Sequence, residues 1–321
     1  MASAQQQDFH AVIELTVDAQ NIRLDQYLAQ HFPEVSRARL QQAIKDGDIL
    51  LNARAVKPKE HVFPGDRISG HVGISVETEA QPEAIPLDIV HADADIIVIN
   101  KPAGLVVHPA VGNPRGTVLN ALLHHFPETR QLPRAGIVHR LDKDTSGLMV
   151  VARSLRAHTS LVQQLQSREM HRTYLALVHR YVTAGNTIDL PMARHHKDRT
   201  RMAVRPDGKE AITHYRIEER FGELTLLRVQ LETGRTHQIR VHMAEIHHPL
   251  VGDPVYGNKT LVPKGMDDHL RERIITFPRQ ALHATELELE HPGSGEYLAF
   301  SAPLPDDMAA LLEELRQANL N

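Results

Sequence analysis

The amino-acid sequence predicts an α+β protein with two domains: a small N-terminal α/β domain, and a larger domain with a mixed, largely antiparallel sheet flanked by helices. The chain has 321 residues, of which 41% are hydrophobic, and this is enough for more than one core. After residue 87 the expected strands outnumber the expected helices, and many follow one another directly, as in hairpins. Residues 77–86 are acidic, contain proline and lack periodicity, which is typical of a linker.

The small domain is expected to comprise residues 18–76. Residues 21–32 carry apolar side chains at helical spacing, and a second, basic helix is expected to begin after Ser36, a good N-cap, and to end at Gly47. Two short strands with a turn-rich segment between them follow. This order of elements resembles the S4 RNA-binding domain. A small α/β module that binds protein is the alternative.

The larger domain is expected to comprise residues 87–321. Its segments alternate between β-branched, apolar runs and runs with apolar residues at helical spacing. Strands are expected at residues 96–101, 148–153, 173–180, 211–221, 223–232, 282–291 and 296–305. Helices are expected at residues 116–126, 154–166, 236–246 and 306–318. In the second of these helices, the side chains expected to face the core are Leu155, Leu161, Val162 and Leu165.

Several classes of protein are disfavoured by the composition. There is no apolar run of 18 residues and no basic, apolar leader, so neither a transmembrane helix nor a signal peptide is expected. The absence of cysteine rules out disulfides and fits a cytoplasmic location. The 22 histidines lack zinc-ligand spacing and no glycine-rich phosphate loop occurs, so neither a metal nor a cofactor is expected. We expect a monomer that has no obligate protein partner.

Charge is unevenly distributed along the chain, although the formal net charge is −4. Residues 71–100 contain six acidic residues and no Lys or Arg. By contrast, residues 36–60 contain six basic and three acidic residues, and residues 194–205 contain five basic residues and one acidic residue. We interpret these two basic segments as RNA-binding surfaces, and solvated charged faces without a ligand are the alternative. The candidate contacts are Arg37, Arg39, Lys45, Arg54, Lys57, Arg194, Arg199 and Arg201.

A carboxylate lies at the entry to a buried strand in the segment GIVHRLDKDTSGLMVVAR. Asp142 follows Arg140 by two residues, and a Thr-Ser-Gly turn then leads directly into the strand. A loop at the end of a rigid strand is a common place for a reactive group. The alternative is that Asp142 only caps the turn, and Asp144 is better placed for that role.

Two further segments supply possible partners for Asp142. Arg240 follows Ile239 in an expected helix, so it can project along the edge of the core, where a partly buried Arg needs an acidic partner. Pairing with Asp142 would keep that carboxylate ionised and able to act as a nucleophile. Tyr174 lies in an apolar strand and could stack on a flat ligand or exchange a proton. A core tyrosine is the alternative.

Four motifs together resemble the RluA family of pseudouridine synthases. They are HRLDKDTSG (139–147), RTYLALV (172–178), GRTHQIRVH (234–242) and INKPAGLVVHPAVGNPRGTVLNALLHHF (99–126). The resemblance covers nearly the whole chain. It implies isomerisation of uridine in RNA to pseudouridine, in which the base leaves C1′ of its ribose, turns, and is rejoined through C5 without a cofactor or a metal. It also implies that Asp142 is catalytic, that Arg240 pairs with it, and that Tyr174 stacks on the base and takes the C5 proton.

The same resemblance implies that the target base is flipped. A uridine in a stem cannot present C1′ and C5 to a side chain, so it has to be extruded, and Arg140 matches the Arg that enters the RNA stack in its place. The S4-like segment and HPLVGDPVYG (248–257) make the chain especially similar to one member that acts on 23S rRNA of the large ribosomal subunit. We therefore expect 23S rRNA or a large-subunit precursor as the partner.

Other substrates and functions were weighed against this interpretation. The same chemistry on tRNA or on another rRNA site is one alternative, and a non-catalytic RNA-binding or ribosome-assembly factor is another. A glycoside hydrolase that uses Asp142 and Asp144 is disfavoured, because such enzymes need two converging carboxylates and a water, and the chain has no Trp for a sugar platform.

Overall fold

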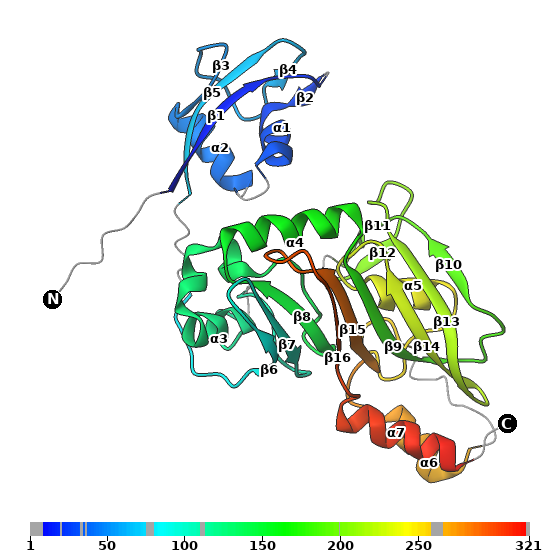
Figure 1. Ribbon diagram of the computed structural model, residues 1–321. Helices are drawn as coiled ribbons and strands as arrows, with labels where there is room; N and C mark the ends of the chain where they lie inside the picture. Colours follow the sequence, from blue (N-terminus) through cyan, green and yellow to red (C-terminus); the bar gives the residue numbers. More distant parts are fainter. Residues whose placement is uncertain are drawn as a thin grey trace. The chain divides into compact units, whose positions relative to one another are not determined.

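The structure of the chain is a computed structural model, and it describes residues 9–19, 21–32, 35, 37–74, 80–109, 113–198, 200–257 and 266–318. Ser36, Arg199 and residues 77–79 of the expected linker lie outside this part. The chain divides into two compact units, residues 1–79 and 80–321 (Figure 1). None of the described helices is long and apolar enough to cross a membrane.

The small unit consists of a three-stranded antiparallel sheet, in the order β1-β5-β3, and two helices that share its core. The two expected helices and the two expected short strands are all present, and strand β1 lies before residue 18, where the domain was expected to start. The elements are β1 (Phe9–Thr16), β2 (Ile22–Arg23), α1 (Leu24–His31), α2 (Arg37–Asp46), β3 (Ile49–Leu51), β4 (His61–Val62) and β5 (Arg67–Ile74).

Apolar side chains from both helices and all three strands form the core of the small unit. Leu24 and Leu28 of α1, and Leu40 and Ile44 of α2, are fully buried in this core. The sheet also requires a glycine, because a Cβ at Gly70 would lie 2.1 Å from the carbonyl oxygen of Asp48. The unit therefore has a core of its own, as an independent domain needs.

The large unit is built on a nine-stranded mixed sheet in the order β10-β13-β14-β9-β15-β8-β7-β6, with β16 paired to β15. Neighbouring strands run antiparallel except for the parallel pair β8 and β15, so the expected mixed, largely antiparallel sheet is confirmed. The strands are β6 (Asp88–Ala92), β7 (Ile96–Lys101), β8 (Ser146–Ala152), β9 (His171–His179), β10 (Asn186–Asp189), β13 (Ile212–Phe221), β14 (Leu224–Leu231), β15 (Leu282–Glu290) and β16 (Tyr297–Ser301). A separate hairpin consists of β11 (Met192–Arg194) and β12 (Met202–Val204).

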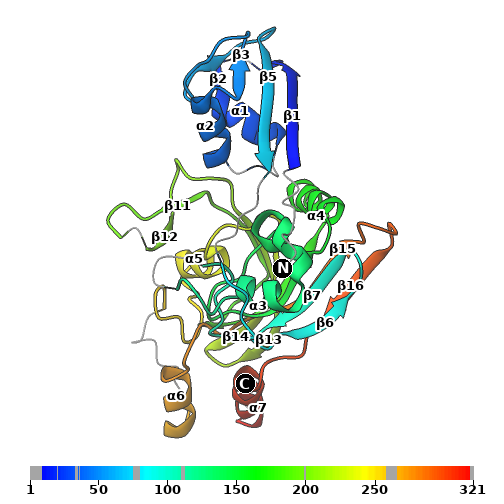
Figure 2. The ribbon, with the colours of Figure 1, turned by 90° about the vertical axis from the view of Figure 1, so that its left-hand side faces the viewer.

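Helices cover both faces of this sheet. Strand β9 shows the division, because successive side chains of a strand point to opposite faces. Its residues Tyr174, Ala176 and Val178 join the core that contains α3 and α5, whereas Leu175 and Leu177 join the core that contains α6 and α7. Helices α6 and α7 lie side by side on the second of these faces (Figure 2). The helices are α3 (Val118–His125), α4 (Leu155–Ser167), α5 (Gln238–Glu245), α6 (Asp268–Ile275) and α7 (Asp306–Gln317).

Helix α4 buries only part of the set of side chains expected to face the core: Leu161 is fully buried and Leu165 packs against the core. Its start is as predicted, since the hydroxyl of Ser154 accepts a hydrogen bond of 3.1 Å from the backbone N–H of Ala157. However, Leu155 is 43% exposed, and the polar side chain of Gln164 is buried instead. The Gln164 amide donates to the carbonyl of Glu290 and accepts from its N–H, at 2.7 and 2.9 Å. These bonds satisfy the buried amide and attach α4 to the end of β15.

Candidate active site

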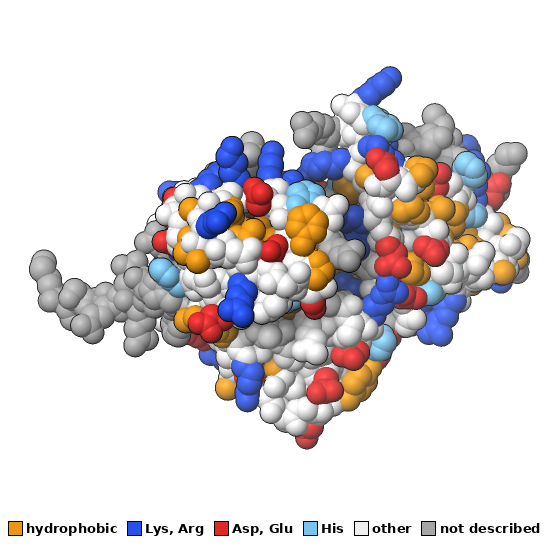
Figure 3. Space-filling model, turned by 90° about the horizontal axis from the view of Figure 1, so that it is seen from above, with side chains coloured by type: hydrophobic (Ala, Val, Ile, Leu, Met, Phe, Trp, Pro, Cys, Tyr) orange, Lys and Arg blue, Asp and Glu red, His pale blue; other side chains and the backbone are white. Residues whose placement is uncertain are grey.

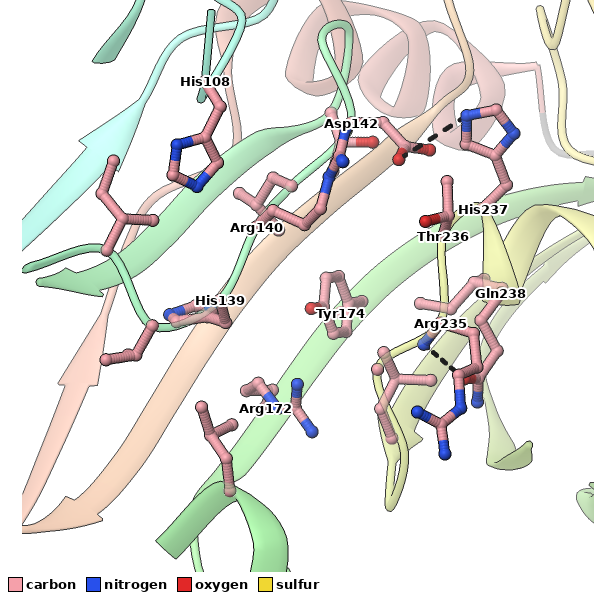
Figure 4. A pocket seen from close by; sticks show the side chains of 18 of the residues that line it. His108, His139, Arg140, Asp142, Arg172, Tyr174, Arg235, Thr236, His237 and Gln238 are labelled. Carbon is pink, nitrogen blue, oxygen red and sulfur yellow. Dashed lines mark hydrogen bonds and ion pairs between the residues drawn. The ribbon is translucent and has the colours of Figure 1, made fainter. Parts of the chain in front are cut away.

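A pocket of about 720 Å³ opens at the ends of several elements of the large unit. It is formed by the loop before β8, strand β9, and the turn that leads from β14 into α5 (Figure 4). All three side chains expected to be catalytic, Asp142, Tyr174 and Arg240, line this pocket. Among the lining residues the only acidic side chain is that of Asp142, whereas five are arginines: Arg134, Arg140, Arg172, Arg235 and Arg240.

The loop that carries Asp142 is fixed by buried side chains from elsewhere in the chain. The ammonium of Lys101 is fully buried and donates to the carbonyls of Pro102, Leu105 and Lys143 at 2.8, 3.0 and 3.0 Å. Burial lowers the pKa of Lys101 to about 7, against the opposing effect of the nearby carboxylates. Arg279 donates to the carbonyl of Asp144 at 3.1 Å. The loop backbone therefore has little freedom to move.

A glycine allows the loop to enter the sheet at the right place. Gly147 is the second residue of β8 and has φ +114°, in the region that favours glycine. A Cβ at this position would lie 2.2 Å from the carbonyl oxygen of Ala284 on the parallel neighbour β15. The turn expected at Thr-Ser-Gly lies instead at Lys143 and Asp144, and Ser146 and Gly147 belong to β8, where the glycine permits close packing on β15.

The expected ion pair between Asp142 and Arg240 is present. Arg240 Nη1 donates to Asp142 Oδ2 at 2.9 Å, and the two side chains are 5% and 15% exposed, respectively. The guanidinium also binds Asp253, with Nε to Oδ2 at 2.7 Å and Nη2 to Oδ1 at 2.9 Å. Asp253 in turn accepts from the backbone N–H of Val255 and Tyr256 at 2.8 and 2.9 Å. Asp253 therefore orients Arg240, and one of the other N–H groups of the guanidinium is donated to Asp142.

Electrostatics favour the charged forms of Asp253 and Arg240. Burial alone would raise the pKa of Asp253, but the hydrogen bonds and the charge of Arg240 outweigh it and lower that pKa. Burial would also lower the pKa of Arg240, but Asp253 and Asp142 raise it above the ordinary value. Arg240 is therefore a permanent cation next to the carboxylate of Asp142.

His237 approaches Asp142 and contacts Tyr256, whose ring lies beneath the guanidinium of Arg240. His237 precedes α5 with φ 58°, and its Nε2 lies 3.9 Å from Asp142 Oδ1. Its Nδ1 lies 2.8 Å from the hydroxyl of Tyr256, which accepts a hydrogen bond of 2.8 Å from the backbone N–H of Met202. Because the Tyr256 hydroxyl accepts from Met202, its own proton is free to go to Nδ1 of His237. That arrangement leaves the imidazole proton on Nε2, facing Asp142.

Tyr174 lies on the floor of the pocket and is 5% exposed. Burial raises its pKa, so the side chain is a neutral phenol at neutral pH. Its hydroxyl has no hydrogen-bond partner among the described residues. In the view of Figure 4 the ring lies between His139 and Gln238, below Arg140 and Asp142. This position suits a ring on which a flat base stacks.

Sequence reasoning missed several residues that hold this site together. His237 lies in GRTHQIRVH, and Asp253 and Tyr256 lie in HPLVGDPVYG, so the resemblance of these motifs to the family was the only signal for the three residues. For Lys101 the only signal was a single Lys at the end of the apolar run IIVINK. Within the described ranges, no three His, Asp or Glu side chains are grouped as metal ligands.

The candidate RNA contacts of the large unit lie in different surroundings. Arg140 is exposed at the pocket, and its guanidinium has no hydrogen-bond or ion-pair partner among the described residues. Arg194 is exposed on the β11–β12 hairpin. Arg201 lies over the ring of Tyr256, with 5.3 Å from its Cζ to the ring centroid. The hairpin is therefore connected to the residues around Asp142, whereas Arg199 lies outside the described residues.

In the small unit, one candidate contact also serves the fold. Arg37 donates to the fully buried Asp25 at 2.9 and 3.1 Å, together with Arg23 and Gln41. Burial tends to raise the pKa of Asp25, but these donors outweigh it and lower the pKa. Arg39 is partly buried, while the other three candidates, Lys45, Arg54 and Lys57, are exposed. On the face of the molecule drawn in Figure 3, Lys and Arg side chains are interspersed with acidic ones.

Comparisons with known proteins identify the family and its domains. A family profile described as "RNA pseudouridylate synthase" matches residues 95–245, and one described as "S4 domain" matches residues 22–68. Two solved structures share the fold: "Human RNA Pseudouridylate Synthase Domain Containing 4" (TM-score 0.55, 25% identity, 71% of this chain and 92% of that chain) and "Human RNA Pseudouridylate Synthase Domain Containing 1" (TM-score 0.53, 25% identity, 74% and 95%).

Sequence relatives are closer still. "Ribosomal large subunit pseudouridine synthase D" of Escherichia coli O6:H1 is 56% identical over 295 residues, which cover 92% of this chain and 90% of the relative. Proteins of the same name from Haemophilus influenzae and Xanthomonas campestris pv. campestris are 55% and 52% identical, with 92% of this chain covered and 91% and 89% of the relatives. The expected family and the expected order of domains are thus confirmed. The chain belongs to the RluA family of RNA pseudouridine synthases and carries an S4 domain in front of its synthase domain.

Proposed function

We propose that the chain isomerises specific uridines of 23S rRNA, or of its large-subunit precursor, to pseudouridine. The observation that carries the proposal is the ion pair of Asp142 with Arg240, in a pocket floored by Tyr174 whose other charged lining residues are all arginines. The names of the relatives, which refer to the large ribosomal subunit, support the choice of substrate. A uridine that is flipped out of its stem can reach such a pocket.

Each residue has a part that follows from its position. Tyr174 is a neutral ring on the pocket floor, so we assign it the stacking of the uracil. A neutral phenol is a weak base, and this favours stacking over removal of the C5 proton. Arg140, exposed and unpaired at the pocket, fills the gap that the base leaves in the RNA stack.

Asp142 acts on the sugar. Breaking the bond from C1′ to N1 develops positive charge on the ribose, which a desolvated carboxylate stabilises. The uracil leaves with the electron pair of N1, while Asp142 either bonds to C1′ or takes the 2′ proton. The base then turns, and C5 bonds to C1′ as the ester to Asp142 breaks or as the 2′ proton is returned. Finally C5 loses its proton to solvent and N1 gains one, so the product is an isomer of the substrate. Because Asp142 is the single acidic side chain among the lining residues, the pocket does not offer the two carboxylates of a glycoside hydrolase.

The remaining parts of the proposal concern organisation. We place the RNA-binding S4 domain at residues 18–76 and the catalytic domain at residues 87–321, joined by the linker 77–86. Exposed Lys45, Arg54 and Lys57 then contact phosphates, as do Arg39, Arg199, and Arg194 and Arg201 of the hairpin. The protein would work as a monomer in the cytoplasm, without an obligate protein partner.

The test is to map pseudouridine in RNA that has been treated with the purified protein. Carbodiimide labelling followed by primer extension reports each modified position in 23S rRNA, 16S rRNA and bulk tRNA, all transcribed without modification. New stops confined to 23S rRNA are expected. Stops in tRNA alone would keep the chemistry and refute the substrate, whereas no stop in any RNA would refute the function and leave an RNA-binding factor.

A further inference from the structure

Arg172 is a buried cation in the pocket that none of the roles above uses. It lies on β9, two residues before Tyr174, so both side chains point to the same face of the strand (Figure 4). Arg172 lines the pocket and is only 7% exposed. Among the described residues its guanidinium has no ion-pair or hydrogen-bond partner, and its Nε is buried without an acceptor.

The surroundings of Arg172 do not compensate its charge. Asp142 is already paired with Arg240. Nε2 of His139 accepts a hydrogen bond of 3.1 Å from the backbone N–H of Val150, so the other ring nitrogen, Nδ1, is a donor. This Nδ1 is also buried without a hydrogen-bond partner among the described residues. Burial and the charge of Arg172 lower the pKa of His139 to about 3, so the imidazole is neutral. A buried, unpaired guanidinium is costly and is normally compensated by an anion or by acceptor oxygens.

A glycine in the facing motif provides the space for this guanidinium. A Cβ at Gly234, the first residue of GRTHQIRVH, would lie 2.8 Å from Nη1 of Arg172. Gly234 has no unusual φ among those recorded for the chain, so its backbone conformation does not demand glycine. The missing side chain leaves room for the guanidinium of Arg172, whose flexible end would otherwise have to shift from this position.

We propose that Arg172 is a recognition residue that donates hydrogen bonds to acceptor oxygens of the flipped uridine nucleotide. The proposal rests on the function proposed above. A guanidinium has five donors and no acceptor, so its complement is a carbonyl or phosphate oxygen. Neighbouring residues on one face of a strand are about 7 Å apart. A base stacked on Tyr174 thus brings O2 or O4 of its edge, or the adjacent phosphate, within reach of Arg172.

Double-mutant cycles between protein and RNA test this contact and identify its oxygen. The proteins carry Asp142→Asn to prevent turnover, with or without Arg172→Gln, and bind a stem-loop that contains the mapped target uridine. The RNA carries either the natural uridine, 2-thiouridine, 4-thiouridine, or a methylphosphonate on its 5′ side. We expect Arg172→Gln to weaken binding of the natural RNA about tenfold or more, as for a hydrogen bond to a charged group.

The cycle separates the possible oxygens. A modification of the contacted oxygen should weaken binding to the Arg172 protein and have little further effect on the Arg172→Gln protein. Coupling to one of the thio-substituted bases identifies a base carbonyl, and coupling to the methylphosphonate identifies the phosphate. Additive effects for all three modifications would overturn the proposal. The proposed function is checked separately, by release of tritium from uridine-labelled rRNA by the protein with Asp142 intact. If tritium is released but the effects of all three modifications are additive, this inference is refuted and the proposed function stands.

A stability measurement distinguishes recognition from a structural role. Removing an unpaired buried charge should leave the thermal unfolding midpoint unchanged or raise it, whereas loss of a structural residue lowers it. Gly234→Ala provides a second variant, because its Cβ would displace the guanidinium and should abolish the same coupling without changing Arg172. If Arg172→Gln lowered the midpoint while RNA affinity stayed at the wild-type level, Arg172 would be structural and the proposal would be wrong.

Discussion

Arg240 holds Asp253 through two hydrogen bonds and Asp142 through one, so Asp253 determines where Arg240 presents its charge to Asp142. Asp253 is thus the buried anchor of the pair, with a side chain only 1% exposed. Arg240 is fixed before any RNA arrives. An arrangement of this kind stabilises charge in a transition state without reorganisation.

The first prediction follows from that anchor. Asp253→Asn keeps the shape and the acceptor for the N–H groups of Val255 and Tyr256, but removes the charge that faces Arg240. Breaking a buried pair in this way costs about 3–5 kcal/mol, so the free energy of unfolding in urea should fall by about 3 kcal/mol. The rate of single-turnover isomerisation should fall as well. Asp144→Asn, on the same loop as Asp142, is the matched control and should leave both quantities near wild type.

A second prediction concerns the hydroxyl of Tyr256, which lies between the N–H of Met202 and Nδ1 of His237. Tyr256→Phe retains the ring under Arg201 and Arg240 but leaves both polar groups without this partner. An unsatisfied buried group costs about 1–3 kcal/mol, so kcat/KM should fall about tenfold or more. Tyr181→Phe, at a ring that is 54% exposed, is the control. Equal activities for the two variants would show that His237 does not need Tyr256.

The third prediction separates RNA contact from folding in the small unit. Lys45→Gln and Lys57→Gln each remove one exposed charge, so each should lower the slope of log K against log salt by about 0.7–0.9 without changing stability. Arg37→Gln should lower the free energy of unfolding by about 1–3 kcal/mol, because Asp25 loses a donor. Filter binding at several salt concentrations and urea titration give the two quantities. Unchanged slopes for both lysines would remove them from the RNA interface.

Acid sensitivity provides a fourth prediction. Burial lowers the pKa of His179 on β9 to about 4 from the ordinary value of 6.5. Between these two values the unfolded chain binds a proton that the folded chain does not, so stability is complete above pH 6.5 and is lost as pH falls towards 4. This shift corresponds to about 3 kcal/mol. His179→Asn should therefore flatten the dependence of unfolding free energy on pH across this window, and an unchanged slope would contradict the assignment.

Elements with strong periodicity could be predicted from the sequence, and so could the pair of Asp142 with Arg240. That pair joins residues 98 positions apart, but both lie in motifs where a charge stands next to core residues. Helix α4 was predicted correctly as a helix with Leu161 in the core, but the burial of Gln164 was missed, because its partner is the backbone of Glu290 in β15 and no local pattern contains that partner.

The same physical reason explains the residues that were missed. Lys101 is bound to three carbonyl oxygens, one of which belongs to Lys143, and Gly234 is adjacent to Arg172. Such contacts exist only after distant segments have packed together. Propensity and spacing describe neighbours along the chain, so they indicate the elements and the reactive side chains but not the residues that hold them in place.

The most direct test of the central claim is tritium release from 23S rRNA labelled with [5-³H]uridine, because release reports loss of the C5 proton. Wild-type protein is compared with Asp142→Asn and with the control Asp144→Asn, and RNA affinity of all three is measured by filter binding. We expect release by wild type and by Asp144→Asn, none by Asp142→Asn, and affinities within about tenfold of one another. Full release by Asp142→Asn protein that is free of wild type would contradict the account.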